Sequence, residues 1–366
     1  NGSYGIDLTM SSVFGNVYKD KRILVTGHTG FKGSWLALWL KKLGAQVTGV
    51  ALPPEGSPSH FELLDLEGGT LTVDIRQLDT LKQTIISVEP DLIFHLAAQS
   101  LVRYGYDHPM DTFSVNIMGT AHVLEAARHT PSVKGVVVVT SDKCYEVLDE
   151  PKRFVESDRM GGFDPYSASK GGAEIIAASM ARSYFKTQQI VSVRAGNVIG
   201  GGDWAADRLI PDLIKGTESK TPVEIRYPKA VRPWQHVLDP LSGYLVLGQS
   251  IISDKPVVGA WNFGPDNASD WPVDKVIGEM QSHYPDLQVS YSKEQHPHET
   301  GYLALDSTKA KEKLGWEPVL TCEEAIAYTA DWYQAYYKDH SVISNQQLDA
   351  YMNKAKTKSL SWTTSE

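Results

Sequence analysis

Short apolar runs alternate with helical patterns along the first part of the chain, starting at Arg22. The apolar runs cover residues 22–27, 45–52, 70–75, 91–98, 133–140 and 190–200, and helical patterns at 34–44 and 77–88 lie between them. Alternation of strand and helix predicts βαβ units and a mostly parallel sheet with helices on both faces. Ligands of such sheets bind beyond the carboxyl ends of the strands.

One of these runs ends in an unusual way. Four valines, Val136 to Val139, are followed without a break by Thr140, Ser141, Asp142 and Lys143. Consecutive β-branched residues are typical of a strand that is buried on both faces. Charged groups at the end of such a strand are costly unless they are paired, solvated or used. This strand end is therefore either a functional site or simply the point where the strand meets water.

The pattern loosens after about Asn197, where glycine and proline cluster and helices are predicted near residues 239–250, 273–282 and 322–337. The predicted fold is α/β, a Rossmann-like doubly wound parallel sheet with a smaller C-terminal substrate-binding lobe. We expect an N-terminal arm at 1–17, in which the polar residues 1–9 are an expression remnant. The dinucleotide-binding domain should cover 18–198 with a return at about 235–265, and the lobe mainly 199–340. A polar, loosely held tail should follow at 341–366.

Composition narrows the possible functions. The chain has 366 residues, 42% hydrophobic residues and a formal net charge of −9. This balance argues against a general nucleic-acid or membrane-surface role, which requires a basic surface. Cys144 and Cys322 lie far apart and match neither a metal-binding spacing nor a disulfide framework, so no metal and a reduced, cytoplasmic compartment are expected. No apolar run reaches the roughly 18 residues of a membrane span.

A glycine-rich turn follows the first predicted strand. In VTGHTGFKGSW, Gly27, Gly30 and Gly33 have GxxGxxG spacing between a strand and a helix. Glycines permit a tight turn and a close approach to a diphosphate, whose charge the helix N-terminus favours. The turn predicts a dinucleotide site. Phe31 is assigned to this site because it lies between Gly30 and Gly33. His28 and Lys32 could contact a phosphate or could equally be solvated.

Other strand ends predict neighbours for the dinucleotide. Asp74 and Ile75 could meet an adenine, and Ala97 and Ala98 leave room for a ribose. Where dinucleotide folds usually place an acid for the adenosine ribose, this chain has Ala51 and Leu52. The expected cofactor is NAD, and NADP is not excluded.

Tyr166 and Lys170 in YSASK are four residues apart and hence on one face of a helix. A tyrosine has an unperturbed pKa of about 10, so a role as a base near neutral pH needs a drop of roughly 3 units, or about 4 kcal/mol. The Lys170 ammonium and an oxidised nicotinamide could supply this stabilisation together.

The motifs TGHTGFKG, HLAAQ, TSD, YSASK and RAGNVIGGGDW resemble the extended short-chain dehydrogenase/reductase family over residues 21–337. The Ser141–Asp142 pair is similar to the sugar-nucleotide 4,6-dehydratases rather than the 4-epimerases. With HTGFKG, VRPWQHV and HPHE, the Asp142–Lys143 pair most resembles the branch that acts on CDP-hexoses. No motif by itself indicates recognition of cytosine, so the CDP assignment depends on the resemblance.

The resemblance implies roles for the residues named above. Such a dehydratase oxidises C4 of the hexose, eliminates water across C5 and C6 and returns the hydride to C6. Tyr166 would take the C4 hydroxyl proton, Ser141 would hold that oxygen and Lys170 would orient the ribose. Asp142 would protonate the departing C6 hydroxyl. Thr140 and Arg194 are assigned to the cofactor site.

Lys143 departs from the dTDP-glucose enzymes, which carry a glutamate there as the base that removes the C5 proton. A lysine does this only when it is neutral, which requires desolvation and nearby positive charge to lower its pKa. The alternatives are that Lys143 pairs with Asp142, or that it holds a water or an enolate.

The substrate diphosphate needs cationic partners despite the negative net charge. Arg208 begins a predicted helix, where the dipole also favours anions, and Arg232 suits bidentate phosphate binding. His298 lies where many relatives carry an arginine. Arg226 is left undecided. The substrate-binding candidates are Gln99, Arg103, Asn197, Arg208, Arg232 and His298.

Two other functions remain open at this stage. One is a 4-epimerase or a dehydratase of another nucleotide hexose, and the other is a dinucleotide sensor without catalysis. The resemblance also implies a homodimer in which helices around residues 116–128 and 166–185 form a four-helix bundle with their copies.

Overall fold

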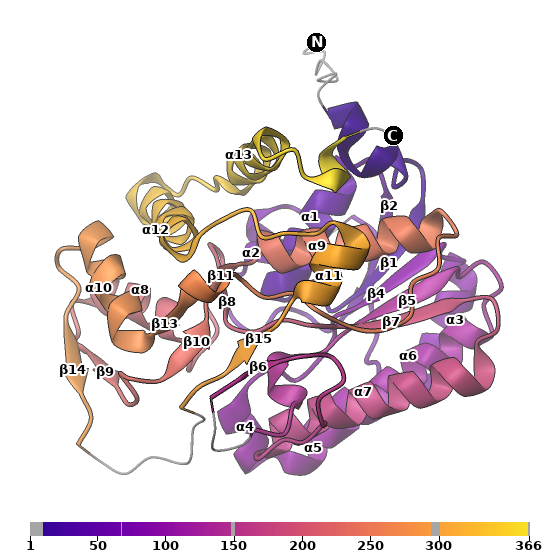
Figure 1. The fold of residues 1–366 in the computed structure, drawn as a ribbon, viewed down its shortest axis with the longest axis horizontal. Coiled ribbons are helices and arrows are strands. Elements are labelled where there is room, and N and C mark those ends of the chain that lie inside the picture. The colour runs from indigo at the N-terminus through magenta and orange to yellow at the C-terminus, as the bar shows by residue number, and fades with distance from the viewer. Residues whose placement is uncertain (1–9, 67, 148–150, 294–300, 365–366) are drawn as a thin grey trace.

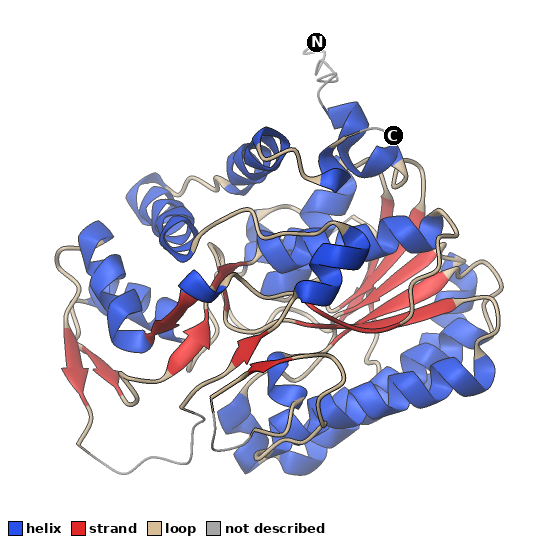
Figure 2. Ribbon diagram, in the orientation of Figure 1, coloured by secondary structure: helices blue, strands red, loops and turns tan. Residues whose placement is uncertain are grey.

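The computed structural model describes residues 10–66, 68–147, 151–293 and 301–364. The described part of the chain is organised around a seven-stranded sheet of order β3-β2-β1-β4-β5-β7-β12, in which every neighbouring pair is parallel (Figures 1 and 2). Its strands are β1 (Arg22–Thr26), β2 (Gln46–Ala51), β3 (Thr70–Thr72), β4 (Leu92–His95), β5 (Gly135–Val139), β7 (Gln189–Arg194) and β12 (Gly259–Asn262). The predicted parallel α/β fold is confirmed.

The strand order reverses between β1 and β4, which lie side by side although β2 and β3 separate them in sequence. Such a reversal opens a crevice at the carboxyl ends of the strands. Helices cover both faces of the sheet, as Figure 1 shows. One layer contains α3 (Leu78–Val88), α6 (Gly119–Arg128) and α7 (Pro165–Tyr184), and the other contains α1 (Phe31–Lys42) and α9 (Leu238–Ile252).

The valine run of β5 is buried between these two layers, as its sequence predicts. Val136 and Val138 pack into the core beneath α3 and α6, while Val137 and Val139 join the core shared with α1 and α9. Alternate side chains of a strand point to opposite faces. An apolar residue at every position is therefore what a strand covered on both sides requires.

Shorter elements connect the sheet to the substrate side. Those that precede β7 are η1 (Met10–Asn16), α2 (His60–Leu63), α4 (Val102–Asp107), α5 (Pro109–Phe113), the π-helical η2 (Ser114–Met118), η3 (Asp142–Cys144) and β6 (Arg153–Phe154). No helix of the described residues has the length and apolar character needed to cross a membrane.

The lobe beyond the sheet is made of helices and two-stranded pairs. The pairs are β8 (Val198–Ile199) with β11 (Gln235–His236), β9 (Val223–Ile225) with β14 (Val289–Tyr291), β10 (Val231–Pro233) with β13 (Asp270–Pro272), and β6 with β15 (Ala304–Leu305). The helices are α8 (Leu209–Ser219), η4 (Asn267–Ser269), α10 (Val273–His283), α11 (Thr308–Leu314) and α12 (Cys322–Asp339). Between these segments the chain returns to the sheet, where α9 covers one face and β12 pairs with β7. The exact domain boundaries stay a prediction.

The expectation of a loosely held tail is wrong for most of its length. Residues Ser344–Thr357 form helix α13 and Ser361–Thr363 form η5. Leu348, Tyr351, Met352 and Ala355, spaced as i, i+3, i+4 and i+7, are buried. This spacing places them on one helix face, which the polar composition of the segment conceals. The C-terminal segment is therefore part of the core.

The ends of the described chain also pack against each other. The ring of Trp362 stacks on that of Phe14 in η1, with centroids 4.9 Å apart. Residues 1–9 lie outside the described residues.

Candidate active site

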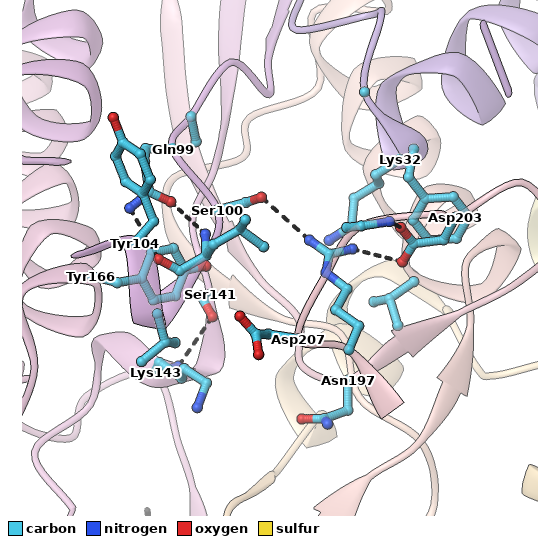
Figure 3. A pocket seen from close by; sticks show the side chains of 18 of the residues that line it. Lys32, Gln99, Ser100, Tyr104, Ser141, Lys143, Tyr166, Asn197, Asp203 and Asp207 are labelled. Carbon is cyan, nitrogen blue, oxygen red and sulfur yellow. Dashed lines mark hydrogen bonds and ion pairs between the residues drawn. The ribbon is translucent and has the colours of Figure 1, made fainter. Parts of the chain in front are cut away.

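A cavity of about 1700 Å³ opens at the carboxyl ends of the strands, between the sheet and the lobe. All the predicted site residues line this cavity except His28, Arg194 and His298. His298 lies outside the described residues. Figure 3 shows Ser141, Lys143 and Tyr166 gathered on one side of the cavity and Lys32 and Asp203 on the other.

At the glycine turn, the backbone faces the cavity because glycines carry no side chains that would stand in front of it. Gly27 has a φ of 73°, and a Cβ built there would lie 2.6 Å from the backbone nitrogen of Ala97. A Cβ on Gly33 would lie 2.1 Å from the carbonyl oxygen of Gly27. Neither position tolerates a side chain, because both contacts are with backbone atoms. The turn at the start of α1 therefore offers a close approach to a diphosphate.

The side chain of His28 neither lines the cavity nor faces solvent, so neither of the two predictions for it, a phosphate contact or a solvated side chain, fits the structure. Its Nε2 hydrogen-bonds the Oγ1 of Thr70 at 2.9 Å, and its ring lies edge-on to Phe61. Burial lowers the pKa of His28 to about 4, so the ring is neutral at physiological pH. A neutral, buried imidazole packed between α2 and β3 is structural.

Arg194 was also predicted as a cofactor residue, but its guanidinium is used elsewhere. It makes a two-pronged contact with Glu174, at 2.9 Å from Nε and 2.8 Å from NH2. Glu174 also accepts hydrogen bonds from Thr140 and Ser192. This buried network fixes the end of β5, where Thr140 precedes Ser141, Asp142 and Lys143.

Ser141, Asp142 and Lys143 lie where β5 gives way to the short helix η3. The Oγ of Ser141 donates to the Oδ1 of Asp142 at 3.0 Å and accepts from the backbone N–H of Lys143 at 3.3 Å. The Oδ2 of Asp142 is buried and has no hydrogen-bond partner among the described residues. A Cβ on Gly196 would lie 1.7 Å from this oxygen, so the glycine makes room for the carboxylate.

A buried carboxylate oxygen without a partner is costly. Asp142 is 2% exposed and lines the cavity, so it is a buried carboxyl group at the cavity wall. Lys143 makes no ion pair with Asp142 within the described residues. The interpretation in which these two charges neutralise each other is therefore wrong.

Tyr166 lies in the first turn of the long helix α7 and hydrogen-bonds Ser141. Burial raises the pKa of Tyr166 to about 12, although the hydrogen bond with Ser141 and the charge of Arg208 act in the opposite direction. Burial also lowers the pKa of Lys170 to about 8. The expected depression of the tyrosine pKa is thus absent from the protein alone, and it needs a positive charge brought by a ligand.

Lys32 points into the same space from α1. Burial lowers the pKa of its ammonium to about 7, and the neighbouring charges of Lys170 and Arg208 act in the same direction. Its Nζ lies 5.8 Å from the ring centroid of Tyr244. Three cationic side chains therefore converge near Asp142, which suits an anionic ligand.

On the opposite wall, two arginines are held by carboxylates. The guanidinium of Arg208 pairs with Asp203 at 2.8 Å and contacts Ser100 at 3.3 Å. Arg103 pairs with Asp207 at 2.9 Å. Arg232 is buried on β10 and also faces the cavity. A diphosphate can be met here by cations that are already oriented.

Asn197 and Gln99 approach the cavity from strand ends. Asn197 has a left-handed backbone with a φ of 38°, which turns the chain between β7 and β8. The side-chain amide of Gln99 donates to Thr112 at 2.8 Å and to the carbonyl of Leu101 at 3.0 Å, so its orientation is fixed. Both amides are placed by backbone geometry.

The adenosine end of the cavity contains an arginine that sequence reasoning missed. Arg76 binds Asp74 at 2.6 Å and Asp111 at 2.6 Å, and lowers the pKa of Asp74. At the end of β2, the lining continues with Ala51, Leu52 and prolines, as the sequence indicates. Asp203, Asp207 and Ser100 were missed too. Of these only Asp203, in the GGGDW motif, had a usable signal.

Comparison with known proteins decides the family. A sequence model described as GDP-mannose 4,6 dehydratase matches residues 24–329. The chain belongs to this family. The sequence-based resemblance to extended short-chain dehydrogenases/reductases of the dehydratase branch is therefore confirmed.

Relatives within this family are similar over almost their whole length. CDP-glucose 4,6-dehydratase of Salmonella typhimurium is 42% identical over 351 residues, covering 92% of this chain and 98% of the relative. A dTDP-glucose 4,6-dehydratase of Xanthomonas campestris is 27% identical over 330 residues, covering 85% and 92%.

Solved structures share the fold. The epimerase Mth375 of Methanothermobacter thermautotrophicus has a TM-score of 0.76 and 24% identity, and the match covers 92% of this chain and 98% of that one. DesIV, the dTDP-glucose 4,6-dehydratase of Streptomyces venezuelae with NAD and TYD bound, has a TM-score of 0.74 and 21% identity over 87% and 97%. Because an epimerase and a dehydratase match equally well, the fold alone does not select the reaction.

Proposed function

We propose that this protein is a CDP-glucose 4,6-dehydratase, a hydro-lyase that converts CDP-D-glucose to CDP-4-keto-6-deoxy-D-glucose and water. The observation that carries the proposal is the buried carboxylate of Asp142, which faces the cavity beside Ser141 and Tyr166 with one oxygen unpartnered. An epimerase, which eliminates nothing, has no use for such an acid. The relative of 42% identity supports the choice of a CDP-hexose.

The residues at the glycine turn fit a dinucleotide. Gly27 and Gly33 leave backbone where side chains would block a diphosphate, and Ala97 and Ala98 leave the adjoining strand end open. NAD bound there would store the hydride from C4 of the sugar and release it to C6. Its ribose and adenine would meet Lys170, Ile75 and Asp74. Since no acid follows β2, NADP is also accommodated at this end.

The reacting residues divide the proton transfers among them. Ser141 holds the C4 oxygen and Tyr166 accepts the C4 hydroxyl proton, which its raised pKa permits only when positive charge is bound nearby. Asp142 donates a proton to the C6 hydroxyl as water leaves. Thr140 supports this arrangement through its hydrogen bond to Glu174, rather than by contact with the sugar.

Lys143 is proposed as the base for the C5 proton. It lines the cavity next to Asp142, and no hydrogen bond or ion pair holds its ammonium within the described residues. This role requires the neutral amine. Holding a water or an enolate is the alternative.

The diphosphate would lie against Arg208 and Arg232, with Asn197 beside it, while Gln99 and Arg103 face the hexose. The guanidinium of Arg208 is already oriented by Asp203. Asp203 is held in turn by Tyr333, because the backbone N–H of Asp203 donates to the Tyr333 hydroxyl at 3.0 Å. Helix α12 therefore positions the phosphate-binding wall.

We further propose a homodimer through α6 and α7. Four large apolar side chains on or beside these helices are 49% to 75% exposed: Met110, Met118, Ile175 and Tyr184. Large apolar side chains gathered on adjacent helices favour burial against a second copy. Two free, buried thiols, Cys144 and Cys322, suit the reduced cytoplasmic compartment that we also propose.

The decisive experiment offers CDP-, dTDP-, UDP- and GDP-glucose to the purified protein, with and without added NAD, and measures the products. We expect a 4-keto-6-deoxy sugar from CDP-glucose. A C4 epimer would instead indicate an epimerase. Dinucleotide binding without any change in sugar or nicotinamide would indicate a sensor. Formation of the keto sugar from another nucleotide hexose alone would reassign the substrate.

A further inference from the structure

One arm of the cavity has no role in the chemistry described above. The glycine turn takes the dinucleotide and Tyr166 takes the hexose, while Arg208 and Arg232 take the diphosphate. What remains is the corner between helix α8 and strand β9, beyond Arg208. Its walls are largely apolar, with Pro211 and Ile225 buried and Val273 beside them. A flat heterocycle fits such a corner.

Asp212 brings a carboxylate into this corner. It lies on α8 one turn after Arg208, and it is half-buried and lines the cavity. Its carboxylate makes no hydrogen bond or ion pair with any residue that the structure describes. Lys215 lies nearby but donates to the carbonyl of Trp204 at 2.6 Å instead.

The surroundings of Asp212 favour a ligand that donates hydrogen bonds. Burial raises the pKa of its carboxyl group, and the charges of Asp207 and Asp203 act in the same direction, while Lys215 and Arg226 oppose them. A half-buried carboxylate without a partner carries a desolvation cost. A ligand N–H directed at Asp212 would offset this cost.

We propose that Asp212 reads the nucleobase by accepting a hydrogen bond from the exocyclic amino group of cytosine. This inference rests on the proposed function and names the residue responsible for its base preference. Cytosine carries an N–H₂ donor where uracil and thymine carry the O4 acceptor, and a carboxylate is a suitable partner for that donor. Facing O4, the same carboxylate would be left unpaired and repelled. A site built for one hydrogen-bond pattern rejects the analogue that lacks it.

A second acid, Glu224, lines the same corner but is less suited to this role. It lies on strand β9 between the partly buried Val223 and the buried Ile225, and its own side chain is exposed. An exposed carboxylate stays hydrated and can turn away from an unsuitable ligand. Glu224 therefore provides a matched control, since Glu224→Gln makes the same change of charge in the same corner.

The test compares kcat/KM for CDP-glucose and UDP-glucose in the wild type, Asp212→Asn, Asp212→Ala and Glu224→Gln. For Asp212→Asn we expect the CDP/UDP preference to fall about 10- to 100-fold, mainly through KM, because an asparagine amide can face either base. Asp212→Ala should lose affinity for CDP-glucose without gaining affinity for UDP-glucose. Inhibition by CDP and UDP, measured with the same variants, reports the base preference without the chemical step.

The outcomes separate this inference from the proposed function. If the wild type dehydrates no CDP-glucose, the proposed function fails. If the wild type prefers CDP-glucose and both Asp212 variants keep that preference, Asp212 is not the reader. A loss of preference in Glu224→Gln with none in Asp212→Asn would assign the role to Glu224. A GDP-glucose preference would show that the carboxylate reads the N–H groups of a purine, and this would overturn the assignment to cytosine.

Discussion

The catalytic end and the nucleotide end of the cleft are built differently. At the catalytic end, the residues follow a strand of the central sheet, and the ion pair behind them, Arg194 with Glu174, has side chains only 4% and 5% exposed. On the opposite wall, which continues to the nucleotide end, Arg103 and Asp207 form an ion pair whose side chains are 52% and 35% exposed. The candidate catalytic residues are therefore held by a rigid, buried network. The residues that would recognise the substrate lie on loops and helix ends that are more open to water.

The difference has a physical reason. Proton transfer requires side chains that are fixed relative to one another within a hydrogen bond, and a buried network keeps them so. A diphosphate spreads its charge over several oxygens, so it can be met by cations held through a single ion pair, as Arg208 is held by Asp203. Substitutions at the catalytic end should thus act on kcat and stability, and those at the nucleotide end on KM.

The largest effect is expected from Asp142→Asn. Without the acid, loss of the C6 hydroxyl should slow about 10²- to 10⁴-fold, the range of general acid catalysis. Reduction of the nicotinamide by CDP-glucose should persist, because it precedes the elimination. Product formation and nicotinamide absorbance measured together check this. Dehydration at the wild-type rate would show that Asp142 is not the acid, and this end of the cleft would no longer count as the catalytic end.

A similar loss in kcat is expected from Lys143→Met, about 10²- to 10³-fold if the lysine is the C5 base. The variant should still reduce bound cofactor but fail to place solvent deuterium at C5. Mass spectrometry of the recovered sugar nucleotide measures this. Normal labelling at C5 would reject Lys143 as the base and leave it the role of holding a water or an enolate.

Glu174→Ala should destabilise the protein by about 3–5 kcal/mol, because it leaves the buried Arg194 unpaired. The matched control is Asp207→Asn, which removes the exposed pair with Arg103 on the opposite wall and should cost less than about 1 kcal/mol. Denaturant unfolding of both variants provides the measurement. Equal costs would contradict the contrast between the two ends.

Arg208→Lys keeps the positive charge near Tyr166 but loses the fork of the guanidinium. We expect KM for CDP-glucose to rise about 10-fold with little change in kcat, since a hydrogen bond to a charged group is worth about 1.5–3 kcal/mol. Steady-state measurement of kcat and KM for CDP-glucose tests this expectation. A loss confined to kcat would place Arg208 at the catalytic end instead.

The smallest effect concerns stability and pH. Asp239 on α9 accepts from the backbone N–H of Val319 at 2.7 Å and from the hydroxyl of Tyr351 at 2.9 Å, and burial raises its pKa to about 7. Unfolded, the carboxyl group has a pKa of about 4. Between these values the folded protein holds a proton that the unfolded chain has lost, so stability falls as pH rises through this window and the loss is complete above about pH 7.

Asp239→Asn should remove this contribution. The free energy of unfolding of the wild type relative to the variant should decrease by about 2 kcal/mol from pH 5 to pH 8. Asp349→Asn on α13 is the control, because Asp349 pairs with Lys42 near the surface and should give a flat difference. Chemical unfolding at several pH values measures it. A flat difference for Asp239→Asn would mean that this carboxyl group is not protonated in the folded protein.

Sequence reasoning anticipated the catalytic end well and the nucleotide end only in part. Ser141, Asp142 and Tyr166 line one cavity because each is tied to the end of a recognisable strand or the start of a helix, and their catalytic roles stay a prediction. Arg194 and His28 were misplaced, because a strand end or a glycine turn does not reveal which way a side chain points. Asp203 and Arg76 were missed because their partners come from distant segments.

The sequence alone determined the parallel sheet, the glycine turn and the place of Ser141 and Asp142 at a strand end, since local periodicity and strand-end motifs set them. Tertiary structure decided the rest: that the C-terminal segment joins the core, that Arg194 is used by Glu174, and that Tyr166 has a raised pKa. These properties depend on burial and on partners far apart in the chain, and no local pattern encodes the solvent that a side chain loses when the chain folds.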